Sequence, residues 1–289
     1  MKNKRIEQAY DLARFQYNEM GVDTDEVLKK MDGITISLHC WQADDIGGFE
    51  TSGSEFGGGG IQVTGNYPGK ARTIEELMQD IEKVMELLPG KQRLNLHAVY
   101  GDFAGKKVDR DQIDIVHFQR WIEWAKEHDT GLDFNPTCFS HPNADDGFTL
   151  SSKNDNHRKF WIEHIKRCRM IAAGMGQQLG TPSVNNIWIP DGSKDMTVDS
   201  YKHRTLLKES LNDIFSVDYH PDHLLDSLES KLFGIGSESM VVGSHEFYLA
   251  YAVKNGKMIC LDNGHFHPTE QVSDKISADP FRQLSSCIF

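Results

Sequence analysis

Short apolar runs alternate with longer amphipathic stretches along most of this chain, and this alternation most constrains its fold. Each apolar run is bounded by turn residues, which predicts a strand, and a stretch with helical periodicity separates it from the next. Strands joined by single helices form right-handed βαβ units and a parallel sheet. The predicted strands are Ile34–Trp41, Arg93–Tyr100, Gly131–Asn135, Val184–Ile189, Ser230–Ile235 and Met258–Leu261.

The stretches between the strands carry helix signals of their own. Thr73 and Glu76 form a capping box before a run with one apolar face, and Pro89-Gly90 ends that run. No linker or internal repeat divides the chain. The predicted helices cover residues 6–20, 73–88, 116–127, 156–173 and 204–215.

Glycine motifs for nucleotide binding are missing or incomplete. No G-x-G-x-x-G follows the first predicted strand, so a dinucleotide-binding fold has little support. The Gly57–Gly60 run lacks the Lys-Ser/Thr ending and the following helix of a phosphate loop. We interpret it as a flexible or close-packed loop.

Composition excludes several kinds of partner. The formal net charge is −12 and no Lys/Arg cluster is present, which argues against nucleic acid and anionic membranes. No apolar run reaches the length of a membrane span, and no apolar segment follows the basic N-terminus as in a secretory signal. The five cysteines are odd in number and contain no C-x-x-C pair. We therefore expect reduced thiols and a cytoplasmic location.

The segment after the last predicted strand is rich in residues that bind metals. Asp262, His265 and His267 lie within six residues of one another. A carboxylate beside imidazoles suits a divalent ion such as Mn²⁺ or Zn²⁺. Taken alone, an Asp-x-x-His sequence after a strand is more often a hydrogen-bonded turn than a metal site.

Polar and aromatic residues also occur at the other predicted strand ends. In a parallel barrel these ends share one face, where functional groups gather. The fifth predicted strand begins next to Glu229 and contains Lys231, an i, i+2 pair that would point to one side of the strand. The residues at the other strand ends are His39, Trp41, His97, Asp133, Asn135, Trp188 and Asp191.

Each of these residues also has a purely structural interpretation. Glu229 and Lys231 could form an interior ion pair, His97 could be a satisfied core histidine, and Trp188 could fill the barrel. A thiol nucleophile at Cys40 with its neighbour as the base is not expected, because adjacent strand residues point to opposite faces. The convergence of five strands on one end favours a functional site.

Several longer motifs carry a family resemblance that runs from near Ile6 to about Ser277. On these motifs the chain resembles bacterial L-rhamnose isomerases. Asp262–Glu270 is the last of them. The others are His39–Gln42, Thr64–Arg72, Arg93–Ala98, Leu132–Pro136, Asn186–Gly192 and Glu229–Gly236.

The resemblance implies a (β/α)₈ TIM barrel that interconverts L-rhamnose and L-rhamnulose with Mn²⁺, as a homotetramer. It implies that Glu229 and Asp262 bind the metal that holds the sugar hydroxyls. It implies that His265 binds a second, catalytic metal. A metal-assisted hydride shift is the route favoured in the family, and the sequence leaves an enediol route open.

The resemblance also implies roles for three further residues. Lys231 corresponds to a lysine that hydrogen-bonds the reacting oxygens. His97 suits proton transfer in ring opening, and Trp188 suits packing against the apolar face of the sugar.

The resemblance covers about six of eight strand–helix units. Further metal ligands of the family come from beyond the sixth strand. We therefore expect residues 1–277 to be a truncated barrel domain and residues 278–289 to be a tail outside the family, arising from a frameshift. An inactive remnant and a related metal-dependent sugar isomerase or epimerase stay open as alternatives.

Overall fold

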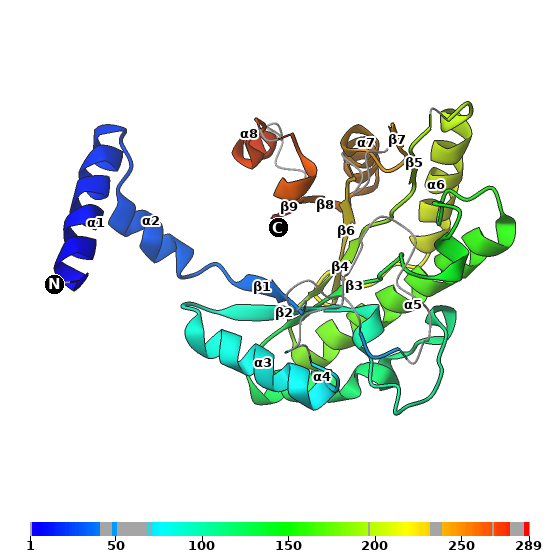
Figure 1. Ribbon diagram of the computed structural model, residues 1–289, viewed down its shortest axis with the longest axis horizontal. Coiled ribbons are helices and arrows are strands. Elements are labelled where there is room, and N and C mark those ends of the chain that lie inside the picture. Colours follow the sequence, from blue (N-terminus) through cyan, green and yellow to red (C-terminus); the bar gives the residue numbers. More distant parts are fainter. Residues whose placement is uncertain are drawn as a thin grey trace.

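The computed structural model describes residues 2–40, 48–50, 69, 71–195, 197–231, 239–267, 269–277 and 286–288. Within them, a parallel sheet keeps its strands in chain order. A doubly wound sheet reverses its strand order at a switch point, whereas a barrel does not. The fold is therefore α/β of the (β/α)₈ barrel type, with an incomplete, curled sheet (Figure 1). Its strands are β1 Ile36–His39, β2 Gln92–His97, β3 Leu132–Asn135, β4 Ser183–Ile187, β6 Leu224–Glu229, β8 Met258–Leu261 and β9 Ser286–Ile288.

One helix connects each strand of this sheet to the next. The predicted cap is confirmed at the start of α3, where the Thr73 hydroxyl accepts the Glu76 N–H at 3.2 Å. Short β5 (Gly192–Ser193) and β7 (Met240–Val241) form a separate antiparallel pair beside the strand ends. The connecting helices are α3 Ile74–Leu87, α4 Gln119–Glu127, α5 Asp155–Leu179, α6 Ser200–Ile214, α7 His245–Asn255 and α8 Val272–Ser277.

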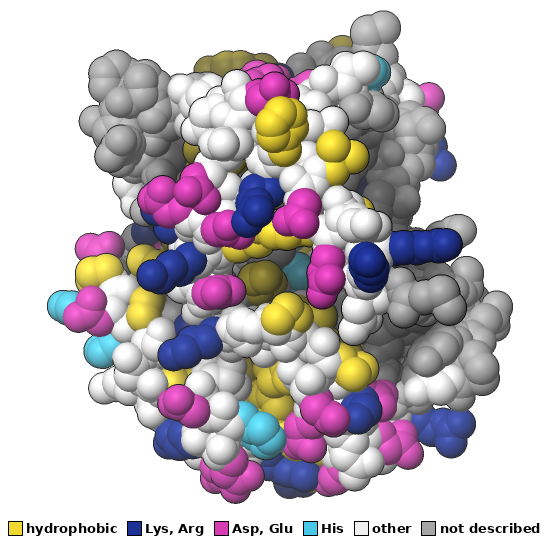
Figure 2. All heavy atoms as spheres, turned by 90° about the vertical axis from the view of Figure 1, so that its left-hand side faces the viewer, with side chains coloured by type: hydrophobic (Ala, Val, Ile, Leu, Met, Phe, Trp, Pro, Cys, Tyr) yellow, Lys and Arg dark blue, Asp and Glu magenta, His cyan; other side chains and the backbone are white. Residues whose placement is uncertain are grey.

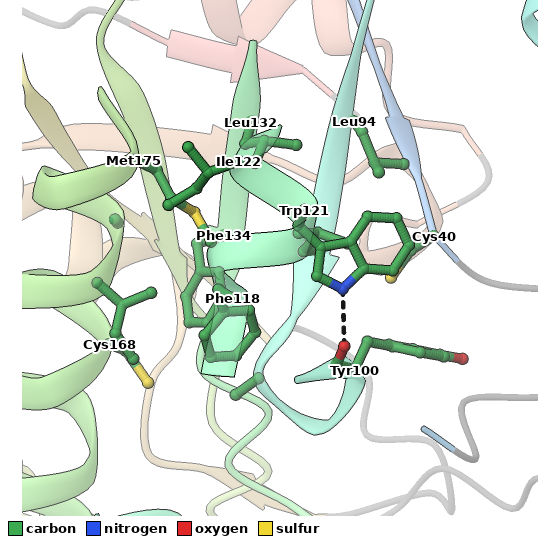
Figure 3. Close-up of a cluster of buried hydrophobic side chains, with 14 of the residues drawn as sticks. Cys40, Leu94, Tyr100, Phe118, Trp121, Ile122, Leu132, Phe134, Cys168 and Met175 are labelled. Atoms are coloured by element: carbon green, nitrogen blue, oxygen red, sulfur yellow. Dashed lines mark hydrogen bonds between the residues drawn. The ribbon is translucent and has the colours of Figure 1, made fainter. Parts of the chain in front are cut away.

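Apolar side chains between the sheet and these helices form the core. In the part of the core under β2 and β3, Trp121 is fully buried and its Nε1–H donates to the Tyr100 carbonyl at 2.8 Å (Figure 3). Phe118 and Phe134 meet edge to face at 5.0 Å. A second cluster lies between β4, β6, β8 and helices α5 to α7. The strand side chains that face the helices are mostly apolar, and the polar residues that alternate with them on β2 and β3 are directed to the inside of the curve.

Two acidic strand residues form ion pairs with arginines. Asp133 of β3 accepts from Arg93 Nε and Nη2 at 3.0 and 2.9 Å and from Ser37 Oγ at 2.6 Å. Asp226 of β6 accepts from Arg169 Nε and Nη2, both at 2.9 Å. Asp133 thus lies within its strand in an ion pair, below the strand end at which the sequence places it.

The fifth strand differs from its prediction. The sequence predicts it at Ser230–Ile235, whereas β6 covers Leu224–Glu229 and ends where that prediction begins. The observed strand contains the acidic residue Asp226, and the Arg169 guanidinium neutralises it. Glu229 is consequently the last residue of the strand, and Lys231 lies beyond it. Residues 232–238 are outside the described residues.

Other boundaries also differ. The second strand ends at His97, and Ala98–Tyr100 forms a 3₁₀ turn. Helices α2 and α7 and strand β9 are absent from the prediction, and β9 pairs in parallel with β8. Trp41, the Gly57–Gly60 run and all of residues 64–72 except 69, 71 and 72 lie outside the described residues.

Helices α1 (Lys2–Glu19) and α2 (Thr24–Met31) stand apart from the barrel (Figure 1). They contact each other through Tyr10, whose hydroxyl donates to Asp25 Oδ1 at 2.5 Å. Both leave large apolar side chains exposed, including Phe15 on α1 and Leu28 on α2. On the face of the molecule in Figure 2, apolar side chains lie among charges of both signs. Among the described residues, no helix has the length and apolar character that crossing a membrane requires.

Candidate metal centre

Two carboxylates and one imidazole meet where β6 and β8 end. Glu229, Asp262 and His265 each offer a ligand atom, and these atoms all lie within 4.8 Å of one another. His265 Nδ1 is 3.4 Å from Glu229 Oε1 and 3.3 Å from Asp262 Oδ2. Glu229 is buried and the other two are partly buried. The structure thus brings together the three residues that the sequence assigns to metal binding. His265, which the resemblance assigns to a second metal, lies in the same cluster as Glu229 and Asp262.

Local structure sets the positions of these groups. Asp262 follows β8 directly, and its Oδ1 accepts the Gly264 N–H at 2.7 Å, which caps the short 3₁₀ helix Asn263–His265. This turn places His265 Nδ1 3.0 Å from the Ser230 carbonyl, next to the end of β6. His267, by contrast, is exposed and hydrogen-bonds Thr269. The turn interpretation of this segment is therefore confirmed at Asp262, and the metal interpretation stays a prediction.

The donor set fits a divalent cation. Two carboxylates and one imidazole supply hard and intermediate ligands with a summed charge near −2, which suits Mn²⁺ or Zn²⁺. Paired carboxylates close to one another repel, and a cation between them removes that repulsion. Glu229, Asp262 and His265 are the residues that would hold such an ion.

A row of buried asparagines leads to Glu229. Asn186 Nδ2 lies 2.5 Å from Glu229 Oε2 and 3.3 Å from Asn135 Oδ1. Asn135 Nδ2 in turn donates to Asn95 Oδ1 at 3.0 Å. Sequence analysis missed Asn95 and Asn186, although each lies two residues before a predicted site residue (His97 and Trp188) and therefore on the same face of its strand.

Lys231 lies beside this row. It is 2% exposed, and its Nζ donates to the Pro190 carbonyl at 2.8 Å. The same Nζ is 5.8 Å from the centre of the Trp188 ring. A buried ammonium is thus fixed next to the carboxylate end of β6.

Stacked and edge-to-face rings connect the end of β2 to the candidate metal ligand His265. The His97 ring lies 6.3 Å from Phe139, which lies 5.6 Å from Trp188. The Trp188 ring is 6.3 Å from His265 at an interplanar angle of 27°. Phe139 is on the loop after β3 and gives no periodic signal, so sequence analysis missed it. These four rings form one aromatic wall.

His97 is fully enclosed at one end of this wall. Its Nδ1 lies 2.9 Å from Thr137 Oγ1. Burial lowers the pKa of His97 well below its ordinary value, and the neighbouring His39 and Arg110 lower it further. The ring is therefore neutral at pH 7.

Cys40 and Asp191 have structural roles. The Cys40 Sγ accepts the His97 backbone N–H at 3.3 Å, and burial raises the pKa of its thiol to about 12, so it is no nucleophile. Asp191 accepts from both N–H and hydroxyl groups of Thr149 and Ser151 at 2.5–2.9 Å. It therefore ties the loop after β3 to the end of β4.

Sequence comparison identifies the family. The sequence model of L-rhamnose isomerase (RhaA) matches residues 4–283. This chain belongs to the L-rhamnose isomerase family. The L-rhamnose isomerase of Rhodopirellula baltica is 55% identical over 273 residues, which are 94% of this chain and 64% of that protein. Those of Citrobacter koseri and Bacteroides thetaiotaomicron are 53% and 54% identical, over 95% and 96% of this chain and 65% of each relative.

The family resemblance stated from the motifs is thus confirmed. This L-rhamnose isomerase family member spans 64–65% of the length of these relatives. The family match continues past Ser277 to residue 283. The division between a barrel domain at 1–277 and a tail at 278–289 stays a prediction.

Proposed function

We propose that this chain catalyses the metal-dependent interconversion of L-rhamnose and L-rhamnulose, with Mn²⁺ as the metal. One observation carries the proposal: Glu229, Asp262 and His265 form a cluster within 4.8 Å, and it lies beside a buried lysine and an aromatic wall. Membership of the L-rhamnose isomerase family supports the choice of sugar.

The chemistry divides between the ion and the side chains. A divalent ion, when bound, supplies Lewis-acid polarisation of the two sugar oxygens on which charge builds in an aldose–ketose interconversion. Glu229, Asp262 and His265 are the residues that would hold metal there. Nζ of Lys231 supplies a fixed positive charge in a buried site, where it stabilises a developing alkoxide far more than it would in water.

The aromatic wall and His97 bind and open the sugar. Trp188 and Phe139 present ring faces and edges that pack on the apolar face of a deoxy sugar and exclude water. His97 is neutral, so one of its ring nitrogens can accept the hydroxyl proton whose removal opens the ring.

Turnover and metal binding test the proposal together. We expect rhamnulose to form from L-rhamnose only with Mn²⁺ present, and Mn²⁺ at ~100 times its Kd to stabilise the fold by about 2.7 kcal/mol. Glu229→Gln should abolish both effects. The control Glu163→Gln changes an exposed i, i+4 pair with Arg167 on α5 and should abolish neither.

Other outcomes separate the alternatives. If Mn²⁺ produced no turnover and no stabilisation of the fold, the proposal would be overturned and an inactive remnant would be favoured. Faster turnover of another aldose than of L-rhamnose would favour a related sugar isomerase or epimerase.

We also propose a cytoplasmic homotetramer. Exposed apolar side chains on α1 and α2 support assembly, and the buried, unpaired thiols Cys40, Cys138 and Cys168 support a reducing compartment. Light scattering coupled to size-exclusion chromatography measures the assembly, and a monomeric mass at micromolar concentration would refute it.

A further inference from the structure

The loop that follows β3 carries backbone strain next to His97. Thr137 has φ +59° and Ser140 has φ +53°, in the left-handed region that favours glycine. For a β-branched residue such as Thr137 this conformation is a true outlier. Strain of this kind persists only where the surroundings enforce it, and it gathers at functional sites.

The buried Arg110 enforces this conformation. Its Nη1 donates to the Thr137 and Phe139 carbonyls at 2.6 and 2.5 Å, and its Nη2 reaches the Ser140 carbonyl at 3.3 Å. Glu50 holds the guanidinium from the other side at 2.9 and 3.1 Å. One side chain thus binds three carbonyl groups of the loop backbone.

The enforced conformation brings the Thr137 hydroxyl to His97. Oγ1 lies 2.9 Å from His97 Nδ1, accepts the Ala98 N–H at 3.2 Å and lies 3.3 Å from the Asn135 carbonyl, to which it donates. A hydroxyl has one hydrogen and two acceptor positions. With the hydrogen directed to Asn135 and one acceptor position taken by Ala98, the other accepts a hydrogen from Nδ1.

We propose that Thr137 is a positioning residue that holds His97 in the Nδ1–H tautomer. Any proton that His97 accepts in the neutral state then goes to Nε2. The strained loop is thus a device that fixes both the orientation and the protonated nitrogen of the imidazole. The catalytic consequence rests on the proposed function, whereas the tautomer itself does not.

Nuclear magnetic resonance of the ¹⁵N-histidine-labelled full chain reads the tautomer directly, without metal or sugar. The His97 signals are assigned as those lost in His97→Gln. We expect Nδ1–H in the unmodified chain, retained in Thr137→Ser, which keeps the hydroxyl. Thr137→Val keeps the shape without the hydroxyl, and we expect a mixture of tautomers or the Nε2–H form.

The matched control is Thr205→Val on α6. It removes a hydroxyl whose hydrogen bond, within the described part of the chain, goes to the Tyr201 carbonyl of its own helix, and it should leave the His97 signals unchanged. An Nε2–H tautomer in the unmodified chain would overturn the inference, and so would a Thr137→Val spectrum identical to that of the parent. Should Thr137→Val fail to fold, the spectra of the parent and of Thr137→Ser still decide.

Kinetics give a second readout. With a working isomerase, Thr137→Val should lower kcat at least tenfold with little change in KM, and Thr137→Ser should restore kcat. Absence of turnover in the parent would count against the proposed function and leave the tautomer measurement intact.

Discussion

The Asn186 side-chain amide donates to Glu229 Oε2 at 2.5 Å, from the neighbouring strand of the sheet. Both residues are buried, and Glu229 is a member of the metal-ligand cluster. Because a hydrogen bond to a carboxylate fixes its orientation, this amide sets the direction in which Glu229 presents its oxygens.

Removing this donor should weaken metal binding. For Asn186→Ala we expect a Kd for Mn²⁺ that rises about 10- to 100-fold and an unfolding free energy that falls by about 1–3 kcal/mol. Isothermal titration and urea unfolding measure the two effects. The control is Asn185→Ala, since the neighbouring amide has no hydrogen-bond partner among the described residues and its loss should leave the Kd unchanged. Equal affinities of the parent and Asn186→Ala would contradict this role.

Breaking the buried ion pair of β6 should cost far more than breaking a surface pair. Arg169 and Asp226 are 2% and 4% exposed at the side chain. Arg169→Met leaves Asp226 buried with only the more distant Lys257 at 3.3 Å, so we expect a loss of about 3–5 kcal/mol in urea unfolding. Lys166→Met, which breaks an exposed pair with Asp213, should cost about 0–1 kcal/mol. Similar losses for both variants would show that burial does not set the cost.

Acid should destabilise the fold through His97. Its folded-state pKa is depressed by burial and by its neighbours His39 and Arg110, so below about pH 6.5 the unfolded chain binds a proton that the folded chain does not. The contribution of His97 to the unfolding free energy is therefore fully present above the pKa of this residue in the unfolded chain. It falls as the pH drops, with a slope of up to about 1.4 kcal/mol per pH unit for this one group. Urea unfolding of the parent and His97→Gln between pH 7 and 5 should show a shallower slope in the variant. Equal slopes of unfolding free energy against pH in the parent and the variant would refute the role of His97 in acid destabilisation.

Truncating the aromatic centre of the core should leave a cavity. Trp121 of α4 is fully buried against the neighbouring strands (Figure 3), and we expect Trp121→Ala to cost about 3–5 kcal/mol. Trp121→Phe keeps most of the volume but leaves the Tyr100 carbonyl without this donor, so it should cost less. Tyr201→Ala, at an exposed position of α6, should change stability by less than about 0.5 kcal/mol. The denaturant midpoints of unfolding rank the three variants by stability. A loss of stability in Tyr201→Ala as large as that in Trp121→Ala would contradict the ranking.

Much of the local structure could be predicted from the sequence. The alternation of apolar runs and helical periods predicted the parallel α/β sheet, and the Thr73 cap was placed correctly, because both depend on residues a few positions apart. Asp262 and His265 were found because one short segment carries them. The fifth strand was misplaced, and the observed strand contains Asp226, whose burial depends on Arg169, 57 residues earlier in the chain.

Three features were decided only by the tertiary structure. The chain brings Glu229 next to His265, places the Asn186 amide on that carboxylate, and uses Arg110 to force Thr137 toward His97. Each depends on which residues of neighbouring strands and loops come face to face. A one-residue shift in register would turn a side chain to the other face of the sheet. The sequence therefore determined the elements and the kinds of ligand, whereas the packing of the sheet and its loops determined which groups meet.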